Sequence, residues 1–307
     1  MLKRKMIEML FEKHEGAKWL TFLTLPVCLL YGWFIYLCWL MGLGNWWNGI
    51  LLISIYLMFF IKLIRNSEWN IWDLRWLVAP IFVFAIAWYI PWWKYTGSWS
   101  DSGSHVYMAL NFIGHWDWML SDYNFRSPLV PGFLSFEILV TGEQYEIYWT
   151  SLVLYTSALW QIQHLCERFS DKYRSILCIV VFALLPVTRF WGQMAMTDVA
   201  VTGMLFFLLH LMLNKNEKFR YYSLFIGVTA AAVFLTKYTF IYLFGIGFWY
   251  IIRGEKIQNI KQFFIGWFLI SLPWYLHQYF VYARNALLIH QTEFVVNSAT
   301  GTGGSHT

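Results

Sequence analysis

The chain has 307 residues, of which 59% are hydrophobic and only 13% are charged, and its formal net charge is +5. This composition excludes an ordinary soluble domain, in which about a quarter of the residues are charged. The excess of cations does not indicate nucleic acid, because most Lys and Arg lie in short loops between apolar segments, where they report membrane topology.

Long apolar stretches follow one another along the chain, and several approach the ~20 residues that a helix needs to cross a bilayer core of roughly 30 Å. We therefore predict an all-α fold, a polytopic membrane protein with about nine transmembrane helices. The predicted spans are 19–43, 47–64, 75–93, 147–165, 174–190, 197–213, 221–236, 238–252 and 262–282. The chain also holds 20 Trp and 19 Tyr, residues that favour the two membrane interfaces.

The cations divide unequally between the two predicted sides. One side holds 17 of the 22 Lys and Arg, and the other holds only Lys94, Arg126, Arg189, Lys237 and Arg284. Cytoplasmic loops carry the excess of positive charge, so the N-terminus is predicted to be cytoplasmic and the C-terminal tail to lie outside.

Four parts are expected in chain order. Residues 1–93 form a cytoplasmic N-terminus and three spans, and residues 94–146 form a long outer loop rich in Trp. Such a loop is predicted to lie in the interface as short amphipathic helices, over a cavity in the membrane. Residues 147–282 form a core of six spans, and residues 283–307 an outer tail.

Three charged residues stand at predicted outer ends of apolar segments: Asp101, Asp198 and Lys237. Ionisable groups beside hydrocarbon are costly, so a functional site is the default hypothesis for them. Structural alternatives stay open for each. Asp101 and Asp198 are suited to capping a following helix, and Lys237 is suited to snorkelling at a helix end.

Other polar residues of the outer loop add to this hypothesis. Arg126 precedes a Pro-rich turn, and the planar fork of Arg binds phosphate oxygens in pairs. A metal site is conceivable from His105, His115, Asp117 and Asp122, although interfacial His more often bonds to backbone or water. No cofactor is therefore predicted, and a divalent metal is left open. The four Cys show neither metal-ligand spacing nor a disulfide framework.

Taken in order, these motifs resemble a known family from about residue 85 onward. The chain is similar to GT-C glycosyltransferases of the dolichyl-phosphate-mannose protein mannosyltransferase type (glycosyltransferase families 39 and 83), and most of all to the bacterial lipid A aminoarabinose transferases. The matching pieces are Asp101 after an apolar segment, Arg126 before Pro128-Leu129, Thr197-Asp198, Leu235-Thr236-Lys237 and Leu272-Pro273-Trp274-Tyr275. The family pattern has Glu after its acidic residue, where this chain has Ser102, so the acceptor contact is expected to differ.

The resemblance implies an inverting transfer of a sugar from a polyprenyl-phosphate donor to a lipid, glycan or protein acceptor. It implies catalytic roles for Asp101 and Asp198, and donor-phosphate binding by Lys237 and Arg126. His105 and Tyr107 are candidates for acceptor contact or support of the site. The resemblance also implies a bacterial inner membrane, an active site on the outer face, and a chain truncated at its C-terminal end.

Two other functions stay open at this stage. One is a non-catalytic subunit that binds lipid through its aromatic loop. The other is a transporter of lipid-linked precursors, which needs polar groups near the middle of the membrane. The predicted spans are expected to be apolar at their centres, which favours the transferase over the transporter.

Overall fold

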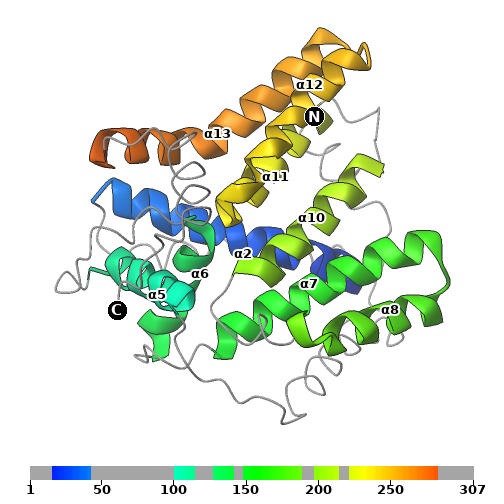
Figure 1. The fold of residues 1–307 in the computed structure, drawn as a ribbon, viewed down its shortest axis with the longest axis horizontal. Coiled ribbons are helices and arrows are strands. Elements are labelled where there is room, and N and C mark those ends of the chain that lie inside the picture. Colours follow the sequence, from blue (N-terminus) through cyan, green and yellow to red (C-terminus); the bar gives the residue numbers. More distant parts are fainter. Residues whose placement is uncertain are drawn as a thin grey trace, which may run out of the picture.

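The structure is a computed structural model that describes residues 16–42, 100–114, 127–141, 148–188, 197–213 and 221–282, and every regular element in these ranges is a helix (Figure 1). The all-α prediction is therefore confirmed for this part of the chain. The elements are α2 (Gly16–Leu40), α5 (Ser100–Phe112), α6 (Leu129–Thr141), α7 (Tyr148–Phe169), α8 (Lys172–Leu184), α10 (Thr197–Leu213), α11 (Tyr222–Thr236), η4 (Tyr238–Phe244), α12 (Gly245–Ile252) and α13 (Ile257–Tyr282).

Seven of the predicted spans coincide with helices. The agreement is closest for 197–213, which matches α10, and for 221–236, which matches α11. The spans 47–64 and 75–93 lie outside the described residues. By length and composition, one described segment, Thr21–Leu40, is long and apolar enough to cross a membrane, and five further apolar segments have only 10–17 residues. α7 has 22 residues and is long enough, but its many polar side chains make it less apolar than Thr21–Leu40.

α2 occupies the middle of the bundle and packs on α6 and α7, and its Tyr36 OH lies 3.0 Å from His277 Nδ1 of α13 (Figure 1). Its contact with α6 is a backbone contact between glycines. A methyl group on Gly32 would collide with the Leu129 carbonyl oxygen and lie 2.9 Å from Phe133 N, and one on Gly132 would collide with the Gly32 carbonyl oxygen. The two helices therefore approach more closely than any side chain at these positions would allow.

α11 and α13 meet in the same way. A methyl group on Gly227 would collide with the Phe263 carbonyl oxygen, and one on Gly266 with the Leu224 carbonyl oxygen. Between these helices the chain turns back at Gly254, whose φ of 66° favours glycine. Small residues at two separate helix crossings are typical of helices that associate without a hydrophobic driving force between them.

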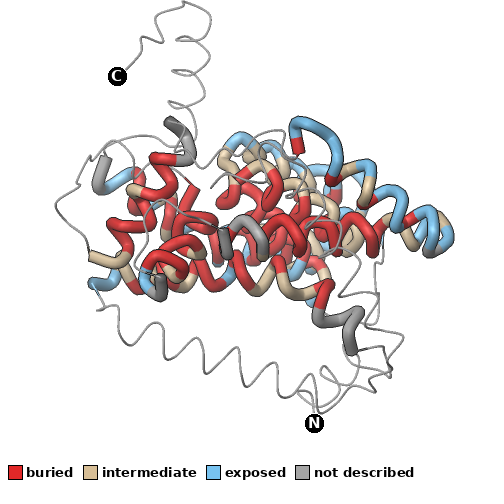
Figure 2. The backbone as a smooth tube through the Cα atoms, turned by 90° about the horizontal axis from the view of Figure 1, so that it is seen from below, coloured by how far each residue is buried: buried red, intermediate tan, exposed pale blue. Residues whose placement is uncertain are grey.

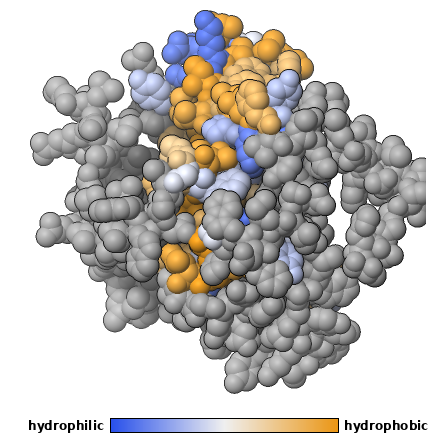
Figure 3. All heavy atoms as spheres, turned by 90° about the vertical axis from the view of Figure 1, so that its left-hand side faces the viewer, coloured by the Kyte–Doolittle hydropathy of each residue, from blue (hydrophilic) through white to orange (hydrophobic). Residues whose placement is uncertain are grey.

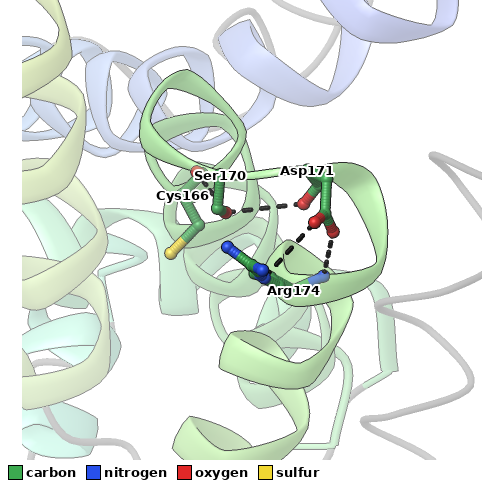
Figure 4. Close-up of polar contacts among 4 residues, drawn as sticks. All are labelled: Cys166, Ser170, Asp171 and Arg174. Carbon is green, nitrogen blue, oxygen red and sulfur yellow. Dashed lines mark hydrogen bonds and ion pairs between the residues drawn. The ribbon is translucent and has the colours of Figure 1, made fainter.

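α7 and α8 form a hairpin closed by a short polar turn (Figure 4). The Asp171 side chain accepts a hydrogen bond from Arg174 N at 2.9 Å, which caps α8, and its carboxylate lies 3.3 Å from Arg174 Nε. Ser170 Oγ donates to the Cys166 carbonyl oxygen at 2.8 Å. Both charged side chains are more than half exposed, so this turn lies at the surface.

Large apolar side chains lie both in the interior and on the surface of the described part of the chain. Buried residues run through the middle of the described tube and include many polar side chains, among them Gln161, His164 and His277 (Figure 2). Large apolar side chains are exposed on α8, including Leu177 at 61%, and on α13, including Leu269 at 62%. Figure 3 shows apolar residues gathered on one face toward the end of the molecule where Figure 1 places α12 and α13.

α6 differs from the expected interfacial helix. It falls inside the predicted loop 94–146, but Leu129, Val130 and Leu134 are at most 1% exposed. The reason is its sequence, which is apolar apart from Ser135, Glu137 and Thr141 and carries Gly132 at the contact with α2. This part of the loop belongs to the core of the bundle.

A buried carboxylate on α6 caps α7. Glu137 is 5% exposed, and its Oε2 accepts a hydrogen bond of 2.8 Å from the backbone N–H of Thr150, the third residue of α7. The first four N–H groups of a helix have no partner within it, and negative charge is favoured at that end. Glu137 thus joins α6 to the start of α7.

Replacing Glu137 with alanine is expected to lower the free energy of unfolding by about 2 kcal/mol, because a buried N–H group loses its partner. Asp171→Ala removes an exposed cap and is the matched control, with an expected loss of at most about 1 kcal/mol. Glu137→Gln keeps an acceptor oxygen and is expected to lose less than Glu137→Ala. Thermal unfolding in detergent, followed by circular dichroism, measures all three, and equal losses for both alanine variants would contradict the role of Glu137.

Candidate functional site

Two of the predicted charged residues form an ion pair. Lys237 Nζ donates to Asp198 Oδ1 at 2.5 Å, and the side chains are 34% and 32% exposed. The residues are 39 positions apart and belong to different helices. The structure therefore brings together Asp198 and Lys237, which the sequence placed at the same predicted end of the bundle.

Each charge stands at a helix end that favours it. Asp198 lies in the first turn of α10, where the helix dipole favours an anion. Lys237 follows the last residue of α11, where the dipole favours a cation. The dipoles of α10 and α11 thus stabilise the two charges. The same geometry also fits a structural role, in which the ion pair only holds the ends of α10 and α11 together.

Lys237 also marks a break in the helix. Its backbone is extended, with φ −148° and ψ 107°, and the chain continues as the 3-10 helix η4 rather than as α11. The Lys237 carbonyl oxygen accepts from Phe240 N at 3.0 Å, so the break is short and ordered by its own turn. A broken helix places backbone polar groups where a continuous helix would hide them.

A third segment converges on this break. Ser127 is 3% exposed, and its Oγ accepts a hydrogen bond of 3.0 Å from the backbone N–H of Tyr238, although the two residues are 111 positions apart. Ser127 stands directly after Arg126 and before Pro128, at the start of α6. The starts of α6 and α10 and the end of α11 therefore meet around Lys237, and we call Ser127, Asp198, Lys237 and Tyr238 the break cluster.

The remaining predicted site residues are placed as follows. Arg126 lies outside the described residues, and the side chain of Asp101 does too, although its backbone forms the second position of α5. His105 and Tyr107 lie on the same helix, the first buried and the second half-buried. α5 packs on α6 through Val106, Ala109, Leu110, Leu134 and Ile138. α5, which carries Asp101 in its first turn, thus adjoins α6, which begins two residues after Ser127.

Two residues of the site region were missed from the sequence. Ser127 was overlooked beside Arg126, although a hydroxyl just before Pro and an apolar run is typical of a helix start. Glu137 was overlooked inside an apolar run, where a lone carboxylate is itself a signal of a structural or functional partner.

The chemistry available at the break cluster is that of anion binding. An ammonium group has three N–H donors, and Asp198 takes one of them. Lys237 is about one-third exposed, so with respect to the described residues its remaining donors are available to a second oxygen ligand that reaches it from outside. Among the residues described, no group of three His, Cys, Asp or Glu side chains is arranged to hold a metal ion.

Comparisons with protein-family models, with curated proteins and with solved structures find no match to this chain.

Proposed function

We propose that this chain is a polytopic membrane glycosyltransferase that moves a sugar from a polyprenyl-phosphate donor to an acceptor on the outer face of the membrane. The observation that carries the proposal is the break cluster. The sequence resemblance assigns Arg126 and Lys237 to one phosphate, and the hydrogen bond between Ser127 and Tyr238 joins the residues next to each of them.

The exposed apolar faces support a membrane location. On α13, Ile265, Leu269, Leu272 and Leu276 are exposed at helical spacing, while Phe263, Trp267 and Trp274 are buried on the other side. Contiguous exposed apolar surface of this kind is rare on soluble monomers and is typical of contact with lipid.

Contacts between helices support the predicted topology. Phe22, near the predicted inner end of its span, packs on His164 and His210, with ring centroids 5.6 and 4.8 Å away. Both His residues also lie near predicted inner ends. Asp198 and Lys237, which pair with each other, both lie at predicted outer ends. Neighbouring helices that alternate in direction across a membrane bring residues at the same predicted depth into contact in this way.

In the proposed reaction the acceptor oxygen attacks the anomeric carbon of the donor sugar while the bond from that carbon to the phosphate oxygen breaks. Polyprenyl phosphate leaves, and Lys237 and Arg126 stabilise its negative charge. Asp101 accepts the proton of the acceptor hydroxyl. A single displacement inverts the anomeric carbon. Asp198 orients Lys237 and limits its positive charge before the donor arrives.

Donor binding to the detergent-purified chain tests the proposal. The chain is expected to bind polyprenyl phosphate at least about tenfold more tightly than the polyprenol that lacks the phosphate, because a charge-assisted contact of the phosphate is worth more than about 1.4 kcal/mol. The two ligands have the same hydrocarbon tail, so equal affinities would mean that the tail alone is recognised. That outcome would contradict a phosphate site and favour the non-catalytic lipid-binding subunit.

A further inference from the structure

α7 has a polar face that is buried rather than exposed. Its polar residues recur at intervals of three and four positions and so share one side of the helix. They are Thr156, Ser157, Trp160, Gln161, Gln163 and His164, each at most 8% exposed. The opposite side of α7 carries Ala158, Leu159 and Ile162, which pack on α8 and α10. The expectation that the spans are apolar at their centres is therefore wrong for α7.

Part of this face is bonded to α2. Gln161 Nε2 donates to the Phe22 carbonyl oxygen at 2.6 Å, and Thr21 Oγ1 and His164 Nε2 are 2.9 Å apart. These two bonds hold the polar face of α7 against the start of α2. Because Gln161 Nε2 is bonded to the Phe22 carbonyl oxygen, the side-chain oxygen Gln161 Oε1 points away from that carbonyl group.

Five polar atoms of the face have no hydrogen-bond partner in the part of the chain that the structure describes. They are Thr156 Oγ1, Ser157 Oγ, Trp160 Nε1, Gln161 Oε1 and Gln163 Oε1. Buried polar atoms are almost always bonded to protein or to ordered water, and leaving them bare is costly. Five on one helix face indicate a common ligand rather than five separate defects.

The chemistry of these atoms identifies the ligand. Hydroxyl groups donate and accept, the indole N–H donates, and the two amide oxygens accept, and none of them is charged. Ser157 and Gln161 are one turn apart, as are Thr156 and Trp160, which is close enough for each pair to share one small molecule. A buried water molecule needs two to four such partners.

The polar face also leads to the surface. Glu167 continues it by one turn beyond Gln163, and Glu167 is half-buried. Next to it, Arg168 is exposed and donates from Nη2 to the Leu213 carbonyl oxygen at 2.9 Å. Polar and charged side chains therefore continue along this face to the exposed end of α7, where the helix meets the turn to α8.

We propose that the polar face of α7 binds a file of water molecules that enters the bundle from the α7–α8 turn. This property is independent of the proposed glycosyl transfer, whose residues lie at the opposite predicted end of the helices. It gives the interior of the bundle a hydrated path between α2 and α7.

Thiol labelling tests the path. In the full chain with its four native cysteines replaced by alanine, Ser157→Cys is compared with Ala158→Cys, whose parent residue is equally buried at 0% exposure but faces α8 and α10. A small water-soluble methanethiosulfonate is expected to modify the Ser157→Cys variant at least about tenfold faster, because a thiol must ionise to react and does so only beside water. Equal rates, whether slow or fast, would overturn the proposal.

A second measurement needs no variant. Hydroxyl radicals formed in bound water oxidise the side chains beside it, so Trp160 in the unchanged protein is expected to be oxidised more than Trp33. These two indoles are matched, since they are 8% and 6% exposed, but Trp33 lies in the apolar core. Equal oxidation of Trp160 and Trp33 would show a dry α7 and would overturn the proposal even where the Ser157→Cys variant fails to fold.

Discussion

Alanine in place of Gly32 or Gly132 is expected to lower the free energy of unfolding by about 2–3 kcal/mol, because overpacking of a tight contact costs that much. The added methyl group has nowhere to go at either position. At Gly132 it would lie 2.7 Å from the Cα and carbonyl carbon of Gly32, and backbone atoms of two packed helices cannot turn aside as a side chain does. The helices must separate, and α2 then loses contact with the core.

Helix propensity predicts the opposite sign, which makes the experiment decisive. Glycine inside a helix is worse than alanine by roughly 0.5–1 kcal/mol, so without the close contact the substitution would stabilise the chain. Gly245→Ala is the matched control, because Gly245 starts α12 with a φ of −59° and nothing lies within 4 Å of the added methyl group. Unfolding in detergent, followed by circular dichroism, separates the two cases. A stabilised Gly32→Ala variant would contradict the contact.

The two glycines report the same contact, so their effects are not expected to add. The variant with both substitutions is expected to lose less than the sum of the single losses, since one separation of α2 from α6 accommodates both methyl groups. Gly227 and Gly266 at the α11–α13 crossing provide an independent pair. One substitution from each crossing is expected to give additive losses.

Removing the positive charge at Lys237 is expected to weaken binding of polyprenyl phosphate by about 100-fold, because a hydrogen bond to a charged group contributes about 1.5–3 kcal/mol. Lys237→Met keeps much of the apolar stem and removes only the ammonium group. Lys261→Met is the matched control, because Lys261 is an exposed lysine near the start of α13, at the opposite predicted end of the bundle. Titration of the detergent-purified variants with labelled polyprenyl phosphate measures the affinities.

Asp198 is expected to have the opposite effect on binding. Its carboxylate occupies a donor of Lys237 and repels an incoming phosphate, so Asp198→Asn is expected to hold or raise the affinity for polyprenyl phosphate. A purely structural clamp predicts otherwise: Lys237→Met and Asp198→Asn would then lower binding and stability together. Equal losses in both variants would therefore contradict a phosphate role for Lys237.

Substitution of Asp101 is expected to affect sugar transfer but not donor binding. Asp101→Asn removes the proposed proton acceptor and leaves the break cluster intact, so the donor is expected to bind while sugar transfer is lost. Transfer that persists in Asp101→Asn would contradict the catalytic assignment. Donor binding in the same sample provides the control for folding.

Much of the helical layout was predictable from the sequence. Apolar run length and the charged residues between runs predicted helices at the positions of α2, α10 and α11, because burial of an apolar stretch and satisfaction of its backbone are local requirements. The distribution of Lys and Arg predicted that Asp198 and Lys237 stand at the same end. The ion pair between them agrees with that prediction.

The sequence did not predict which helices are neighbours within the bundle. The count of cations assigns each helix end to a side but gives no order around the bundle, so it could not show that Ser127 meets Tyr238 or that Glu137 caps α7. Nor did it show that α6 enters the core. That position depends on Gly132 facing Gly32, a fit between surfaces that are 100 positions apart in the chain.

The polar face of α7 shows the same division. Its spacing is visible in the sequence, since Ser157, Gln161 and His164 lie on one side of any helix that contains them. Whether that side faces solvent or the interior depends on what packs against it, and α2 decides this by approaching with Thr21 and Phe22. The sequence by itself determined which segments are helices and where charge accumulates, since these follow from interactions within one segment. Only the tertiary structure decided which faces meet, because that choice depends on the shape and polarity of residues brought together from distant parts of the chain.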